Sequence, residues 1–141
     1  MRKERANKLK LLNLELYKEL YRRSKTNYSK NQPNMSLASS IVSRYKNIDK
    51  RKGLLSICDF TSRWMADNII GKSCFYCGDL SSGCDRIDNS IGHIKSNCVP
   101  CCHRCNTIRN NIFTPDEMKI LGPIAKKIID DRIKIIDIEN K

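Results

Sequence analysis

Residues 74–106 read CFYCGDLSSGCDRIDNSIGHIKSNCVPCCHRCN, and this stretch decides how the middle of the chain folds. It contains many turn-forming residues and too little apolar content to form a core without help. Cys74 and Cys77 place two thiolates on a tight turn, and Gly78 allows the backbone to fold back. A second Cys pair downstream would complete a tetrahedral zinc site and hold the segment together.

The second half of this zinc site has two candidates, Cys98–Cys101 and Cys102–Cys105. We favour Cys102 and Cys105, because Asn106 and a helix-compatible run follow them. Four thiolates leave no position for water or substrate, so the zinc would be structural. The remaining cysteines are interpreted as small buried apolar residues, with Cys98 and Cys101 kept as alternative ligands; they are Cys58, Cys84, Cys98 and Cys101.

The net charge of +12 is concentrated at one end of the 141-residue chain. Residues 1–52 carry fifteen Lys or Arg and four Asp or Glu, a net of +11, whereas residues 53–141 carry twelve and eleven, a net of +1. This asymmetry favours a polyanionic partner, with nucleic acid as the first candidate and a solvated helix surface as the alternative. No apolar stretch is long enough to span a membrane, and no secretory signal is visible. We therefore expect a cytoplasmic protein, whose cysteines are thiols or metal ligands.

Helices are expected before the cysteine-rich stretch. Residues 3–22 show helical spacing of leucines, and residues 24–36 form a polar loop. Residues 36–50 are weakly helical, and DKRKG at 49–53 is interpreted as a linker. Residues 59–70 are predicted to form a short amphipathic helix, capped by Asp59 or Thr61. Its Trp64 is interpreted as a core residue.

Helices are also expected after it. Thr114, Pro115 and Glu117 predict a helix start at residue 114. Gly122–Pro123 is expected to interrupt this helix. Residues 123–138 then carry an isoleucine stripe that we assign to core or dimer packing. The chain is thus predicted to be α+β: a basic, mainly helical extension over 1–52, a zinc-stapled domain over 53–122, and a C-terminal helix over 123–141 that packs on the core or on a partner.

Two oxygen-bearing side chains lie on either side of the second zinc half. Asp85 falls in a strand expected around 84–87, and Asn106 begins the next helix. A carboxylate and an amide oxygen could hold Mg²⁺ or Mn²⁺ together with phosphate oxygens and water. Such a cation can stabilise the leaving 3′ oxygen when a phosphodiester is cleaved.

The ordered set CFYCG followed by GCDRIDNSIGHIKSNCVPCCHRCNTIRNN resembles the HNH endonuclease family, in its zinc-stapled, phage-type branch. The resemblance covers about residues 58–122. It implies a small ββα-metal core, an enzyme that hydrolyses phosphodiester bonds of duplex DNA, a structural Zn²⁺ and a catalytic Mg²⁺ or Mn²⁺. If the protein is phage-encoded, it would act in the host cytoplasm, with DNA as its partner and with a homodimer or a larger phage complex as possible assemblies.

The resemblance also assigns roles to single residues. Asp85 and Asn106 match the metal-binding positions, and Asn97 matches the residue that braces the catalytic loop. Cys74, Cys77, Cys102 and Cys105 match the structural zinc ligands. Arg109, one turn after Asn106, would face phosphate. Further DNA contacts are expected from basic residues of the motif and of the extension: Arg86, Arg104, Arg22, Arg23, Lys50, Arg51 and Lys52.

Arg86 departs from the family pattern, in which the general-base His follows the Asp. A guanidinium stays protonated and is not a base. Three interpretations follow: Arg86 clamps the phosphate while another group activates water, His93 supplies the base, or cleavage is lost and DNA binding remains. A zinc ribbon docked on a larger machine is a further alternative. Asp88 and Asn89 are interpreted as turn residues.

Overall fold

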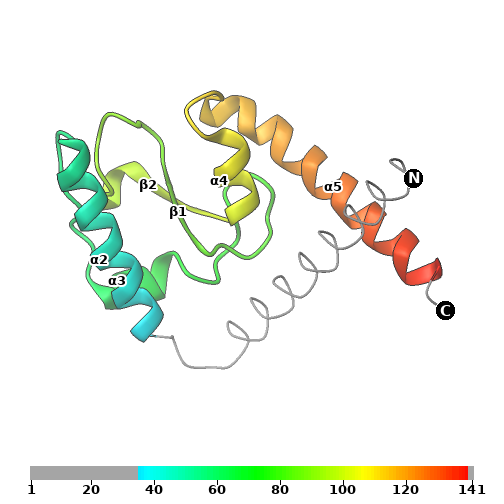
Figure 1. The fold of residues 1–141 in the computed structure, drawn as a ribbon, viewed down its shortest axis with the longest axis horizontal. Helices are drawn as coiled ribbons and strands as arrows, with labels where there is room; N and C mark the ends of the chain where they lie inside the picture. Colours follow the sequence, from blue (N-terminus) through cyan, green and yellow to red (C-terminus); the bar gives the residue numbers. More distant parts are fainter. Residues whose placement is uncertain (1–34, 140–141) are drawn as a thin grey trace, which may run out of the picture.

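The computed structural model describes residues 35–139. Figure 1 shows a small two-stranded sheet in the middle, with helices α2 and α3 on one side and helices α4 and α5 on the other. The elements in chain order are α2 (Met35–Lys52), α3 (Ser62–Asn68), β1 (Gly83–Arg86), the short 3₁₀ helix η1 (Lys95–Asn97), β2 (Cys98–Cys101), α4 (His103–Arg109) and α5 (Pro115–Glu139). This mixture of helices with one small antiparallel sheet confirms the α+β prediction.

Helix α2 is longer than predicted and belongs to the main core. Ala38, Ile41, Val42 and Tyr45 are buried at helical spacing and pack with Phe60, Met65, Ile69 and Ile70. The linker expected at 49–53 is therefore wrong, because helix α2 continues to Lys52. Asp49 is fully buried on the same face of the helix. Residues 35–52 thus pack in one unit with the residues that follow them.

Helix α3 is a shortened form of the helix predicted over 59–70. Thr61 caps it, since its hydroxyl accepts a hydrogen bond from the main-chain N–H of Trp64 at 3.1 Å. Phe60 and Ile69 are almost fully buried at its two ends, and Trp64 packs against the core while partly exposed. The expected apolar face is confirmed, within narrower bounds.

The two strands pair antiparallel, with Asp85 opposite Val99 and Arg86 opposite Cys98. They are joined by the long loop that carries Asp88, His93 and η1. Helix α4 follows β2 after a single residue, Cys102, which serves as its N-cap. Gly83 pairs with Cys101 at the end of the sheet next to Cys102, and Arg86 pairs with Cys98 at the end that leads into the loop.

Helix α5 begins as predicted. Thr114 and Glu117 form a reciprocal cap: the Glu117 carboxylate accepts from the Thr114 N–H at 2.7 Å, and the Thr114 hydroxyl accepts from the Glu117 N–H at 3.2 Å. The predicted interruption at Gly122–Pro123 is wrong, because α5 runs unbroken through Pro123. A Cβ at Gly122 would lie 3.0 Å from Tyr76, so this glycine permits close packing and does not end the helix.

The isoleucine stripe of α5 is only partly covered. Ile124 and Ile128 are 51% and 46% exposed, whereas Ile129 and Ile133 are half-buried. Core packing therefore does not account for Ile124 and Ile128 within residues 35–139. Helix α5 extends away from the sheet, as Figure 1 shows. No helix in this part of the chain is long and apolar enough to cross a membrane.

Candidate active site

Four cysteines form a cluster suited to a metal ion. The Sγ atoms of Cys74, Cys77, Cys102 and Cys105 all lie within 4.8 Å of one another. The distance between Cys77 Sγ and Cys102 Sγ is 3.6 Å, close to the edge of about 3.8 Å that Zn–S bonds of about 2.3 Å give in a tetrahedron. The cluster could hold a structural metal such as zinc. It uses the pair favoured from the sequence, Cys102–Cys105.

Arg104 lies beside the cluster. Arg104 places Nη2 3.4 Å from Cys77 Sγ and 2.7 Å from the Asp79 carboxylate. Arg104 was expected to contact DNA, but its side chain is only 9% exposed. The ion pair with Asp79 and the contact with Cys77 direct it toward the zinc half-site, so that expectation is corrected.

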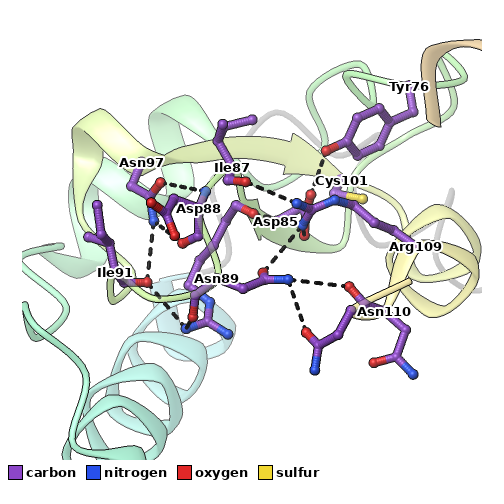
Figure 2. Close-up of polar contacts among 12 residues, drawn as sticks. Tyr76, Asp85, Ile87, Asp88, Asn89, Ile91, Asn97, Cys101, Arg109 and Asn110 are labelled. Atoms are coloured by element: carbon purple, nitrogen blue, oxygen red, sulfur yellow. Dashed lines mark hydrogen bonds and ion pairs between the residues drawn. The ribbon is translucent and has the colours of Figure 1, made fainter. Parts of the chain in front are cut away.

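Asp85 lies at the centre of strand β1 and is held from two sides, as Figure 2 shows. Its Oδ2 accepts a hydrogen bond from the Tyr76 hydroxyl at 2.5 Å. Its Oδ1 lies 2.8 Å from Arg109 Nη1. Tyr76 lies between Cys74 and Cys77, whereas Arg109 belongs to α4, the helix that contains Cys105. Both parts of the cysteine-rich segment therefore orient this carboxylate. Burial raises the pKa of Tyr76, which keeps its hydroxyl a donor.

Arg109 was expected to face phosphate, and the structure corrects this. The residue is 3% exposed, and its guanidinium also donates to the main-chain oxygens of Arg86 at 2.7 Å and Ile87 at 2.9 Å. These bonds close the end of strand β1 onto helix α4. Arg109 is therefore a buried structural cation, with no free face for a ligand.

Asn97 braces the loop between the strands. Its side-chain oxygen accepts from the Asp88 N–H at 2.9 Å, and its Nδ2 donates to the carbonyls of Asp88, Ile91 and Gly92 at 2.9, 3.3 and 3.2 Å. Asn97 is buried. Asp88 forms the predicted turn, since its carboxylate accepts from the N–H of Ser90 at 2.8 Å. Asn89 adds a bond to Asn111 at 2.9 Å, which joins the turn to the residues after α4.

Arg86 ends strand β1 and is half-buried. Its Nη1 donates to the main-chain oxygens of Asn89 and Ile91, both at 3.2 Å. One edge of the guanidinium is thus fixed by the loop. An arginine held in this way presents a fixed cation, whereas it has no lone pair with which to accept a proton.

His93 is held by helix α2. Its Nδ1 lies 2.6 Å from Asp49 Oδ1, and its main-chain N–H donates to Asp49 Oδ2 at 2.8 Å. Its ring stacks on Tyr45 with centroids 4.0 Å apart and planes 5° apart. Burial lowers the pKa of His93, while Asp49 opposes that shift. Gly92 permits this approach, because a Cβ there would collide with the Ser56 carbonyl and lie 2.8 Å from Asp49 Oδ2.

These elements surround one open cleft of about 550 Å³. Strand β1 supplies Asp85 and Arg86, the loop supplies His93, and α4 supplies Asn106. Helix α2 adds the exposed cations Arg44 and Lys52 at the opposite wall. The cleft thus combines one carboxylate, the imidazole of His93 with that of His103 at the rim, several amides and several cations. Such a set suits a phosphate group and a divalent cation bound together.

The other predicted site residues have different positions. Lys50 and Arg51 are exposed in the last turn of α2. Arg22 and Arg23 lie outside the described residues, as does the predicted helix over 3–22. Sequence reasoning missed Asp49, Tyr45 and Tyr76. A signal for Asp49 existed: it continues the helical spacing of Ala38, Ile41, Val42 and Tyr45, so a carboxylate falls on an apolar face.

Comparison with solved structures agrees with this arrangement. The rare-cutting HNH restriction endonuclease PacI is similar, with a TM-score of 0.56, and the match covers 67% of this chain and 80% of that chain at 23% identity. The chain has an HNH-type fold. The four-cysteine cluster and the ββα order fit that fold, as the motif residues predicted. At this identity the likeness concerns the HNH fold and not the reaction.

Comparison of sequences gives one relative without an assigned role. An uncharacterised protein, R423, of Acanthamoeba polyphaga mimivirus is 32% identical over 82 residues. The match spans 55% of this chain and 15% of the mimivirus protein. No family model matches the chain. The HNH-type fold is thus found here in a chain whose cleft has Arg86 where the family pattern has histidine.

Proposed function

We propose that the protein is a metal-dependent DNA endonuclease of HNH type, which hydrolyses phosphodiester bonds of duplex DNA. The observation that carries the proposal is the shared cleft: Asp85, Arg86, His93 and Asn106 come from three elements and line one hollow. The HNH-type fold and the cations on α2 support it. The nuclease class thus rests on geometry as well as on the motif.

Each residue of the cleft has a proposed task. Arg86, fixed by two carbonyl groups, clamps the scissile phosphate through its free edge. Asn97 keeps the loop in the shape that presents His93. Lys52, with its neighbours Lys50 and Arg51, contacts the DNA backbone from the wall formed by α2. We also propose that Arg22 and Arg23, in the N-terminal extension, contact the phosphates of the DNA.

Asp85 and Asn106 are the proposed holders of Mg²⁺ or Mn²⁺. Each Asp85 oxygen accepts one hydrogen bond, and a carboxylate oxygen has a second acceptor position. Because Arg109 already offsets the Asp85 charge, these two residues fit a cation that arrives with phosphate better than a cation alone. When bound, the cation would stabilise the charge that develops on the leaving oxygen.

The first test is cleavage of supercoiled plasmid in Mg²⁺ and, separately, in Mn²⁺. Asn106→Ala is the main control, because Asn106 is exposed and its removal leaves the buried network intact. Asp85→Asn serves as a second control, matched for zinc content and thermal stability. We expect nicked or linear product from the wild-type protein alone. Intact plasmid under every metal, with tight DNA binding, would reject the nuclease proposal.

The second candidate function is DNA binding without cleavage. The observation that favours it is the occupied Asp85 carboxylate, already bonded to Arg109 and Tyr76, beside an arginine that cannot act as a base. This alternative expects DNA affinity that falls steeply with salt and does not change with Mg²⁺. The plasmid test separates the two functions.

A further inference from the structure

We infer that Asp49 and Tyr45, on helix α2, are positioning residues that make His93 the general base of the cleft. This inference rests on the proposed nuclease function. It assigns the task that Arg86 cannot perform to a histidine held from outside the motif. The geometry that points to it is the contact of His93 with α2, which no part of the motif predicts.

Asp49 selects the form of the imidazole. An ionised carboxylate only accepts hydrogen bonds, so the 2.6 Å contact with Nδ1 requires the hydrogen to be on Nδ1. Nε2 then keeps its lone pair. Asp49 is itself fixed, because its Oδ2 accepts from the main-chain N–H groups of His93 and Cys58 at 2.8 and 2.9 Å. The fully buried carboxylate thus sets both the tautomer and the place of the ring.

Tyr45 fixes the plane of the ring. The parallel stack, at 4.0 Å and 5°, leaves the imidazole little freedom to rotate. Tyr45 is in turn anchored, since its hydroxyl accepts from the Cys84 N–H at 3.0 Å, one residue before Asp85. The aromatic ring therefore sets the position of His93 relative to strand β1. In this way α2 aligns the base with the proposed metal-binding carboxylate.

His93 lines the same cleft as Asp85, Arg86 and Asn106. Because Nδ1 is bonded to Asp49, Nε2 is the ring nitrogen left for the cleft. The charged groups around the ring are Asp49, which favours the imidazolium, and Arg86 and Lys52, which disfavour it.

The step balances without an oxidant or reductant. Nε2 takes a proton from a water molecule as its oxygen bonds to phosphorus, and the bond from phosphorus to the 3′ oxygen breaks. The leaving oxygen takes a proton from solvent, and the imidazolium returns its proton to solvent. One water is consumed for each bond cut. A pKa below the ordinary value of histidine keeps the base neutral at neutral pH.

The experiment is single-turnover cleavage by His93→Ala with and without added imidazole. We expect a loss of roughly 100-fold or more and a partial rescue by imidazole. His103→Ala, which removes the exposed imidazole at the rim of the cleft, is the matched control and should cleave normally. Cleavage by His93→Ala within threefold of wild type, or a loss that imidazole does not restore at any concentration, would overturn the assignment.

Asp49→Asn provides the second arm. An asparagine can turn its amide toward Nδ1 and donate, which moves the hydrogen to Nε2 and removes the lone pair from the cleft. We expect a rate loss of at least about tenfold, and a rising limb of the pH–rate profile that moves to lower pH. If this variant does not fold, Tyr45→Leu, which removes the stack, takes its place and should slow cleavage by a similar factor.

Nitrogen NMR of the His93 ring separates failure of the positioning role of Asp49 from failure of the nuclease proposal. The wild-type protein should show the Nδ1–H form whether or not it cuts DNA. An Nε2–H form would overturn the positioning role even in an active enzyme. An Nδ1–H form in a protein that cuts no DNA would reject the nuclease and the role of His93 as base, while the contact with Asp49 would stand.

Discussion

Arg109 Nη1 lies 2.8 Å from Asp85 Oδ1 and 2.7 Å from the main-chain oxygen of Arg86, so one guanidinium joins helix α4 to strand β1. Both charged side chains are about 5% exposed or less. A buried pair of this kind is costly to break from one side, because the remaining charge has no partner. The stability of strand β1, which supplies Asp85 and Arg86 to the cleft, therefore depends on Arg109, an arginine that does not line the cleft.

Arg109→Met is expected to lower the free energy of unfolding by roughly 3–5 kcal/mol. The reason is the unpaired Asp85 carboxylate together with two orphaned carbonyls. Urea unfolding of the zinc-loaded protein measures it. Arg63→Met is the matched control, since Arg63 and Asp67 form an exposed pair at 2.7 Å that should contribute about 0–1 kcal/mol. Equal losses in both variants would contradict the structural role.

Cys102→Ser is expected to abolish stoichiometric zinc binding and to unfold the segment around the cysteines. The cluster needs four thiolates, and serine supplies a poor ligand. Zinc content by mass spectrometry and far-ultraviolet circular dichroism check the result. Cys98→Ala is the control, because Cys98 lies outside the cluster. This variant should keep one zinc per chain. Zinc loss in Cys98→Ala with retention in Cys102→Ser would reverse the ligand assignment.

Asn97→Ala is expected to lower stability by roughly 1–3 kcal/mol and to reduce cleavage more than DNA binding. The side chain satisfies one N–H and three carbonyls of the loop. Asn97→Asp should be worse, because it sets carboxylate oxygens against those carbonyls. Thermal melts and plasmid cleavage provide the two readings. A variant with an unchanged melting temperature would show that the loop holds its shape without this residue.

The free energy of unfolding should decrease as the pH falls through a window set by His93. Burial lowers its folded pKa below the unfolded value of about 6.5, so the unfolded chain binds the additional proton first. The stabilising contribution is therefore present above pH 6.5 and is lost as pH falls through the folded pKa. Unfolding curves between pH 5 and 7 measure this effect. His93→Gln should flatten the dependence, whereas a slope unchanged from wild type would assign it to another group.

Lys52→Gln is expected to reduce the salt dependence of DNA binding by about one phosphate contact, a change of roughly 0.9 in the slope of log K against log salt. Lys52 is exposed and lines the cleft. Fluorescence anisotropy at several salt concentrations gives the slope. Lys134, exposed on α5, is the control position. The same change for Lys134→Gln would place the DNA path elsewhere.

Local chemistry explains which features the sequence could predict. The spacing within each Cys-x-x-Cys pair predicts two thiolates on one turn, and Thr114 predicts the start of α5, because each depends on residues close in sequence. The continuity of α5 through Pro123 was not predictable in the same way. Gly122 looked like a stop signal, although its role is a close contact with Tyr76, a residue 46 positions away.

Tertiary contacts explain what the sequence could not predict at the site. Arg109 carries the expected spacing from Asn106, yet the partner of its guanidinium is Asp85 and not solvent. The bond between His93 and Asp49 spans 44 positions. Asp49 begins the charged run DKRKG at 49–53, and the charge of this run suggested a linker. Asp49 differs from its exposed neighbours because it lies on the face of α2 that packs against the core.

Helix α2 limits how this nuclease-like core can be divided or transplanted. A fragment that starts at residue 53 would retain every residue of the recognisable motif, but it would lack the Asp49 carboxylate and the apolar face that covers Phe60 and Met65. Grafting the motif alone onto another DNA-binding protein should thus yield an insoluble or misfolded chimera. A transferable cassette therefore has to include helix α2, Met35–Lys52, together with the motif.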